Sequence, residues 1–262
     1  MNREQTLKMQ DNHNVEMYGS THVGTRDYQQ DRMNMYRADS FCAAIVCDGM
    51  GGREHGEKAS QYAVDYITNA LSHISAEGYI NTMLTNAAFE ANDAITEFQD
   101  ASGRPLKAGT TVVTALIAGD GLHIMSVGDS RIYLIRDGKI TQLTQDQNYR
   151  LRLNELLKLG LITQPEYDKE SKRAEALISF LGVGEPIMVD TKGPYELLQN
   201  DIILLCSDGL YKGLSNDAIN NIVNSNIHNV ADIPDELIKA ARQNTAAGMD
   251  NTTVVIMRYT LD

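Results

Sequence analysis

The sequence has little positive charge: 23 lysines and arginines stand against 35 aspartates and glutamates, which gives a formal net charge of -12. A nucleic-acid-binding protein usually carries a basic patch or an excess of basic residues, so the composition argues against that class. The longest uninterrupted apolar run, Phe41 to Cys47, falls far short of the roughly 20 residues that a membrane-spanning helix needs. The opening MNREQTLKMQ lacks the apolar stretch of a signal peptide. We therefore expect a cytoplasmic protein whose partners include neither nucleic acid nor a membrane.

Cysteine, glycine and proline are also scarce. The cysteines are Cys42, Cys47 and Cys206; their number is odd, each lies in an apolar run, and no Cys/His spacing matches a zinc motif. We interpret them as buried thiols of a reducing compartment. Glycine and proline together account for only 25 of the 262 residues, which leaves little room for a long linker. We expect polar residues 1–14 to be loose and residues 15–262 to form a single domain.

What the sequence does contain is a series of short strands and longer helices. Runs rich in Val, Ile, Thr and Tyr predict strands at Val15–Thr21, Met33–Arg37, Phe41–Cys47, Thr110–Ile117, Leu122–Val127, Arg131–Arg136, Ile202–Cys206 and Thr253–Tyr259. Asp120-Gly121 and Asp137-Gly138 predict two-residue hairpin turns, which make the joined strands antiparallel. Apolar residues at helical spacing predict helices over Glu57–Ile74, Tyr79–Phe98, Asn148–Leu159 and Asp235–Asn244, with a short one capped by Ser215. Helix pairs between blocks of antiparallel strands indicate an α+β domain whose helices cover the sheet faces.

Acidic residues stand where the apolar strands end. Asp48 follows FCAAIVC, Asp208 follows IILLCS, Asp250 precedes the last strand, and Asp31 comes five residues after Arg26. Carboxylates that converge from several strands repel one another unless a cation lies between them. Oxygen ligands suit Mg²⁺ or Mn²⁺, so this pattern is compatible with a hard-cation site at one edge of a sheet.

The alternative for each aspartate is a turn. A single Asp-Gly pair is more typical of a turn than of a metal ligand, and we assign Asp120 and Asp137 in that way. Because Asp48, Asp208 and Asp250 are far apart in the chain, no local spacing code distinguishes them from turn residues. From the chemistry of the residues alone, both interpretations stay open.

Six short motifs follow one another between about Thr21 and Tyr259. They are G-x-R-x-x-x-Q-D at Gly24–Asp31, DGMGGxxxGE at Asp48–Glu57, AGTT at Ala108–Thr111, VGDSR at Val127–Arg131, CSDGL at Cys206–Leu210 and MDNTT at Met249–Thr253. In this order they resemble the protein phosphatase 2C family of metal-dependent serine/threonine phosphatases, and the compact DGMGG form resembles its stand-alone bacterial branch. The resemblance implies a four-layer α/β/β/α sandwich, two antiparallel sheets flanked by helix pairs, in which residues 147–181 form a flap beside the active site.

The resemblance also implies a centre for two Mn²⁺ or Mg²⁺ ions, with a third, weaker ion in bacterial members. The implied ligands are Asp31, the bridging Asp48, the carbonyl of Gly49, Asp208 and Asp250, with Asp129 as a candidate beside the third ion. Arg26 would bind the substrate phosphate, because its planar guanidinium matches phosphate oxygens. A hydroxide between the two metals would attack the phosphorus of phosphoserine or phosphothreonine, with Arg26 and Asp48 as the catalytic side chains.

The implied partners are phosphorylated proteins, the products of a cognate Ser/Thr kinase, and the family's habit predicts a monomer. Met50 stands where several members of the family carry a histidine proposed to protonate the leaving group, so the proton donor stays open, with His55 as one candidate. Two alternatives stay open for the function. One is a catalytically idle regulatory module on the same fold, and the other is a metal-dependent nuclease, which the charge of -12 opposes.

Overall fold

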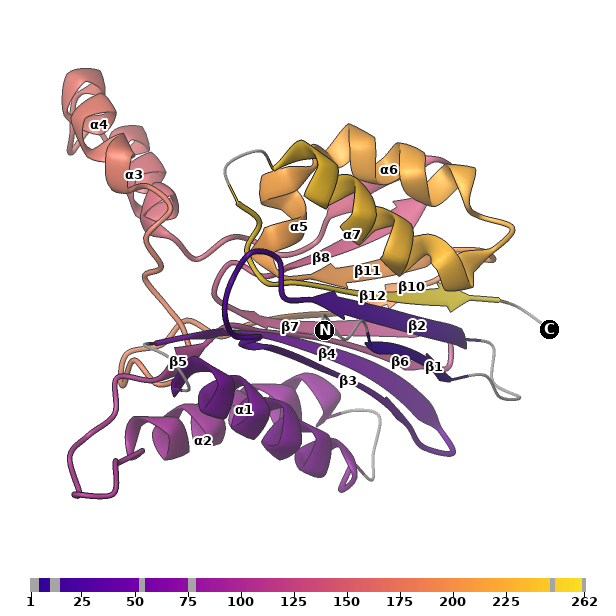
Figure 1. The fold of residues 1–262 in the computed structure, drawn as a ribbon, viewed down its shortest axis with the longest axis horizontal. Helices are drawn as coiled ribbons and strands as arrows, with labels where there is room; N and C mark the ends of the chain where they lie inside the picture. Colours follow the sequence, from indigo (N-terminus) through magenta and orange to yellow (C-terminus); the bar gives the residue numbers. More distant parts are fainter. Residues whose placement is uncertain (1–4, 10–14, 52–54, 75–78, 246–247, 261–262) are drawn as a thin grey trace.

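Two antiparallel sheets pack face to face, and helices cover the outer face of each (Figure 1). The computed structural model describes residues 5–9, 15–51, 55–74, 79–245 and 248–260. This arrangement confirms the α+β class that the sequence predicts and the four-layer α/β/β/α sandwich that the resemblance implies.

The first sheet has the strand order β1-β2-β12-β11-β8-β9. Its strands are β1 (Gln5–Met9), β2 (Val15–His22), β12 (Thr252–Tyr259), β11 (Ile202–Cys206), β8 (Arg131–Arg136) and β9 (Lys139–Gln142). The second sheet has the order β10-β7-β6-β4-β3, and the short β5 pairs with β4. Its strands are β10 (Asp190–Glu196), β7 (Gly121–Val127), β6 (Val112–Ala118), β4 (Phe41–Met50), β3 (Asp31–Arg37) and β5 (Gly109–Thr110).

The helices form one group on each sheet and a third group outside the sandwich. The second sheet is covered by α1 (His55–Leu71) and α2 (Ile80–Thr96), and the first by α5 (Asp208–Gly213), α6 (Asn216–Ser225) and α7 (Ile233–Asn244). Helices α3 (Tyr149–Lys158) and α4 (Gln164–Glu170) project away from the sandwich (Figure 1). Backbone hydrogen bonds from Arg150 to Ala174 and from Ile178 to Gln147 close the base of this projection. Within the described residues, no helix has the length and apolar character that crossing a membrane requires.

Strand β4 shows why the chain forms layers. Its alternate residues Phe41, Ala43, Ile45 and Cys47 pack against α1 and α2, and the residues between them pack into the core between the sheets. Because side chains alternate across a strand, a strand that is buried on both faces must be apolar at every position. The uninterrupted run FCAAIVC meets this requirement, and all three cysteines are buried free thiols, as predicted.

The structure differs from the sequence prediction mainly at edge elements and short elements. The first hairpin turn is Gly119–Asp120 rather than Asp120-Gly121, because Ala118 pairs with Gly121 and Gly119 takes the positive φ of 58°. The Asp137–Gly138 turn is as predicted, with positive φ at both residues. Strands β9 and β10 and helices α4 and α5 were not predicted. Gln5–Met9, inside the segment expected to be loose, pair with β2 as β1, while residues 1–4 and 10–14 lie outside the described residues.

Candidate metal centre

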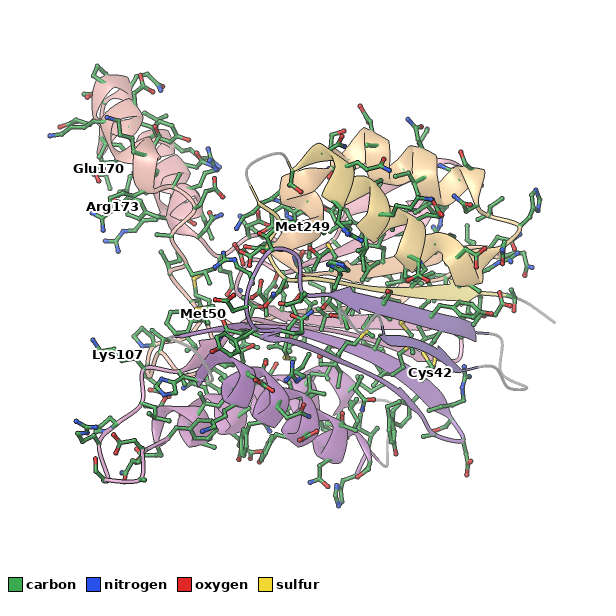
Figure 2. The ribbon with its side chains drawn as sticks, viewed as in Figure 1. Cys42, Met50, Lys107, Glu170, Arg173 and Met249 are labelled. Carbon is green, nitrogen blue, oxygen red and sulfur yellow. The ribbon has the colours of Figure 1, made fainter. Side chains whose placement is uncertain are left out.

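Antiparallel pairing brings five aspartates to one end of the sandwich. The end of β4 lies beside the start of β3, and the end of β11 lies beside the starts of β12 and β8. The end of β7 lies beside the start of β6, which in turn pairs with β4. Figure 2 shows Met50, the last residue of β4, and Met249, which precedes Asp250, at the same end of the molecule. The aspartates that follow or precede these strand ends therefore share one edge.

Asp31 and Asp48 lie on neighbouring strands at this edge. They are register partners on β3 and β4. Asp31 is 2% exposed, and its Oδ2 accepts hydrogen bonds from the hydroxyls of Ser207 (2.7 Å) and Thr253 (2.8 Å). The backbone of Asp48 is fixed by Thr111, whose N–H donates to the Asp48 carbonyl at 2.9 Å. Both carboxylates are thus held by the strands rather than by a loop.

Asp208 and Asp129 lie on the side of the first sheet's helices. Asp208 is the first residue of α5, and its Oδ2 forms an ion pair with Lys212 one turn later. Asp129 follows β7 and is buried, and the Tyr211 hydroxyl donates to its backbone carbonyl at 3.1 Å. The guanidinium of Arg131 lies 3.5 Å from the centre of the Tyr211 ring, which fixes α5 against the start of β8.

Asp250 and Arg26 lie at the rim. A guanidinium nitrogen of Arg26 donates to Asp250 Oδ2 at 2.7 Å, and the Arg26 side chain is 61% exposed. Together with Lys212, they line a hollow of about 310 Å³ beside the acidic cluster. A larger hollow of about 720 Å³ lies along α1, around Tyr62 and Phe98, and none of the five aspartates lines it.

The five carboxylates act on one another electrostatically. Burial and the repulsion of Asp31, Asp208, Asp129 and Asp250 raise the pKa of Asp48 well above its usual value. Burial also raises the pKa of Asp31 to about 7, against the opposing hydrogen bonds from Ser207 and Thr253. Burial and Asp208 raise the pKa of Asp129 to about 6. Mutual repulsion of this kind disappears when a cation lies among the carboxylates.

Two buried oxygens test whether the cluster fits a metal. The Oδ1 atoms of Asp31 and Asp208 are both buried without a hydrogen-bond partner, an arrangement that is costly unless a cation or donor completes it. Across the described part of the chain, no three His, Cys, Asp or Glu side chains are already arranged to hold a metal ion. Two of the five carboxylates are paired with cations of the protein, Asp208 with Lys212 and Asp250 with Arg26. The donor set of carboxylate oxygens fits hard divalent cations.

The amide of Asn251 makes three hydrogen bonds to the loop of residues 23–30, which carries Arg26. The Asn251 side chain donates to the carbonyls of Val23 (2.8 Å) and Tyr28 (3.0 Å) and accepts from the N–H of Gln30 at 2.7 Å. Gln29, in turn, donates to the Thr21 hydroxyl and accepts from the N–H of Asp31. The position of Arg26 thus depends on the residue that follows Asp250.

Gly49 lies where two other backbone segments approach β4. A Cβ atom placed on Gly49 would lie 2.2 Å from the carbonyl oxygen of Gly56 and 2.6 Å from that of Gln30. Only glycine fits there, which is a packing reason for the Asp-Gly pair in addition to the carbonyl role that the resemblance implies. Residues 52–54 of the same motif lie outside the described residues.

The structure therefore brings together Asp31, Asp48, Asp129, Asp208 and Asp250, with Gly49 beside them and Arg26 at the rim. Sequence reasoning missed Lys212 and Asn251. Lys212 shares a helical face with Asp208, but no helix was predicted there. Asn251 lies inside the MDNTT motif, which is the signal that could have identified it. Met50 ends β4, and His55 begins α1 without a contact that ties it to the aspartates.

The chain is similar to known phosphatases over most of its length. Residues 18–250 match the family described as Protein phosphatase 2C. The chain is 32% identical over 241 residues to serine/threonine phosphatase stp of Listeria welshimeri, across 90% of this chain and 92% of that protein. It superposes on the S. agalactiae serine/threonine phosphatase with a TM-score of 0.81 and 28% identity, across 94% of this chain and 100% of that one. For the catalytic domain of the phosphatase PstP in complex with two manganese ions, the TM-score is 0.75, the identity 29%, and the coverage 94% and 99%.

Proposed function

The chain belongs to the protein phosphatase 2C family, and on that premise we propose that it hydrolyses phosphoserine and phosphothreonine esters of proteins with the help of two Mn²⁺ or Mg²⁺ ions. The observation that carries the proposal is the pair of buried Oδ1 atoms of Asp31 and Asp208, which lack partners inside a cluster of five carboxylates. The substrates are phosphorylated proteins, the products of a Ser/Thr kinase.

The residues proposed to hold the ions are Asp31, Asp48, Asp208, Asp250 and the carbonyl of Gly49. When bound, two such ions acidify water and neutralise charge on the phosphate. Asp48 is central to this set, because the four other aspartates all act on its carboxylate. The hydroxyls of Ser207 and Thr253 both bind Oδ2 of Asp31, which leaves its buried Oδ1 without a hydrogen-bond partner.

Arg26 is the residue proposed to bind the phosphate. Its guanidinium pairs with Asp250 and is mostly exposed. Once a cation neutralises Asp250, this pair weakens and the guanidinium is free to donate to phosphate oxygens, which it matches in geometry. Asn251 keeps the loop in place for this exchange. Met50 has no proton to donate to the leaving oxygen, and we assign that role to no side chain.

Hydrolysis of a phosphothreonine peptide tests the proposal. We expect turnover with Mn²⁺, loss of turnover with a chelator, and loss in Asp208→Asn. Asp217→Asn, which removes an exposed carboxylate in the first turn of α6, serves as the matched control and should keep full activity. A protein that binds Mn²⁺ but hydrolyses no phosphopeptide at any metal concentration would instead be the idle module. No observation favours that alternative.

A further inference from the structure

Lys212 is a half-exposed cation that the fold pairs with the acidic cluster. It lies one turn after Asp208 on α5, and its Nζ forms an ion pair with Asp208 Oδ2. Residues four apart on a helix are neighbours on its surface, so α5 directs the ammonium toward the carboxylate of its own first residue. One carboxylate oxygen of Asp208, a proposed metal ligand, is thus already paired with an ammonium.

The two oxygens of Asp208 have different surroundings. Oδ2 is held by Lys212, whereas Oδ1 is buried without a partner. Oδ1 is therefore available to an ion, while Oδ2 is taken by the ammonium. We call the surroundings of Asp31 and Asp48 the inner part of the cluster, and the surroundings of Asp208 Oδ2 and Asp129 its outer part.

Three carboxylates act on the ammonium of Lys212. Asp208 forms an ion pair with it, and the charges of Asp129 and Asp250 act on it as well. Conversely, Lys212 lowers the pKa of Asp129, against burial and Asp208. Tyr211, the neighbour of Lys212, keeps α5 against the Asp129 backbone through its 3.1 Å hydrogen bond. The ammonium thus serves two carboxylates at once.

The number of charges in the cluster indicates that the Lys212 ammonium replaces a divalent ion. Five carboxylates carry five negative charges, and two divalent ions with the Lys212 ammonium balance them once Arg26 has left Asp250 for the phosphate. A third divalent ion in the outer part would have to displace Lys212 from Asp208 and would leave its ammonium close to a doubly charged ion. Repulsion between cations at such short range is strong even near a surface.

We propose that the ammonium of Lys212 occupies the outer part of the cluster, between Asp208 and Asp129, in place of a third divalent cation, so that this chain binds two metal ions. The inference rests on the proposed metal centre and deepens it. It assigns Asp129 to Lys212 as its counter-ion rather than to a metal.

Equilibrium dialysis against Mn²⁺ followed by elemental analysis tests this assignment without any measurement of activity. We expect two Mn²⁺ per wild-type chain up to millimolar concentrations. Lys212→Ala should bind a third Mn²⁺ at least about tenfold more tightly than the wild type does, because the competing charge is gone. The double variant Lys212→Ala/Asp129→Asn should return to two ions. It lacks the Asp129 carboxylate, which would otherwise bind an ion in the space left by the ammonium.

Two further variants act as controls. Lys212→Arg retains the charge and should stay at two ions. Lys239→Ala removes a lysine from a comparable helical ion pair, with Glu236 on α7, and should also stay at two. Circular dichroism shows whether each variant is folded, and Lys212→Gln replaces Lys212→Ala if the latter is not.

The outcomes separate this inference from the proposed function. Three ions in the wild type, or two in both neutral Lys212 variants, would overturn the inference and leave the two-metal centre standing. Fewer than two ions in the wild type would overturn both. A change in the KM for a phosphopeptide without a change in ion number would show that Lys212 binds substrate instead, and would also overturn the inference.

Discussion

Asp31 and Asp48 lie directly opposite each other across β3 and β4. Like charges at directly opposed positions of a sheet are destabilising. Asp31 is buried and Asp48 is partly buried, and desolvation raises the pKa of each. Two neighbouring strands therefore present a repulsive pair that the fold does not neutralise by itself. The predictions below follow from this pair and from the residues around it.

The stability of the metal-free protein should fall as the pH rises from about 4 to about 7. Asp31 has a folded-state pKa of about 7 against 3.8 as its ordinary value. The folded state therefore binds more protons than the unfolded state in this interval, and stability decreases with pH there. Thermal unfolding in the presence of a chelator measures this effect.

Asp48→Asn should reduce the loss of stability that the metal-free protein shows as the pH rises. Removal of the central carboxylate relieves its repulsion with the other four, so the metal-free variant should unfold about 5 °C above the wild type at pH 7.5. Mn²⁺ should raise the unfolding temperature of the wild type and have little effect on the variant. A variant that is less stable than the wild type without metal would contradict the assignment of Asp48 to a repulsive cluster.

Arg26→Ala should weaken the binding of phosphate esters more than the binding of metal. We expect the KM for a phosphopeptide to rise about tenfold or more, since a charge-assisted hydrogen bond is lost. The Mn²⁺ affinity should stay within about threefold, because the partner of Arg26, Asp250, becomes free for a metal. Arg104→Ala, in an exposed ion pair with Asp100, is the matched control. Equal losses of ester and Mn²⁺ binding would show that Arg26 supports the metal centre itself.

Asn251→Ala should displace the loop that carries Arg26. Three hydrogen bonds are lost, and the expected destabilisation is about 2–3 kcal/mol, accompanied by a raised KM. Urea unfolding and steady-state kinetics check the two effects, with Asn220→Ala on α6, which loses an exposed hydrogen bond to the Gly138 carbonyl, as the control. An unchanged KM in a destabilised Asn251 variant would limit this side chain to a structural role.

Gly49→Ala should be among the most damaging single substitutions in this region. The added methyl group would meet backbone oxygens at 2.2 and 2.6 Å, which cannot move as a flexible side chain could. A destabilisation of several kcal/mol is expected. Gly138→Ala is a useful comparison, because open space surrounds Gly138 and only its φ of 73° resists alanine. Its cost should be about 1 kcal/mol. Similar costs at the two positions would refute the close approach at Gly49.

Much of the fold was predictable because its central strands are buried on both faces. FCAAIVC and IILLC leave few alternatives to a buried strand, and Arg131–Arg136 and Ile202–Cys206 have the predicted bounds. Elements at the edges were not predictable in the same way. Strand β10, with Gly193 and Pro194 and a register shift between Lys192 and Tyr195, lacks the alternation that marks a half-buried strand. Helix α5 is too short to show a period.

The site was predictable to the extent that its residues follow strand ends. Asp48, Asp208 and Asp250 could be singled out in this way, and the order of the motifs added Asp31, Asp129 and Arg26. The pairing of Lys212 with Asp208 and the three hydrogen bonds of Asn251 depend on tertiary geometry, because each needs a backbone direction that no local pattern fixes. The sequence therefore predicted the acidic residues but not the side chains that position and neutralise them.

A crystal grown with Mn²⁺ and measured at the manganese absorption edge tests the central claim most directly. We predict two anomalous peaks, both among Asp31, Asp48, Gly49, Asp208 and Asp250, with the Lys212 ammonium beside Asp129. Peaks elsewhere on the surface, with these five residues bound to no ion, would contradict the account.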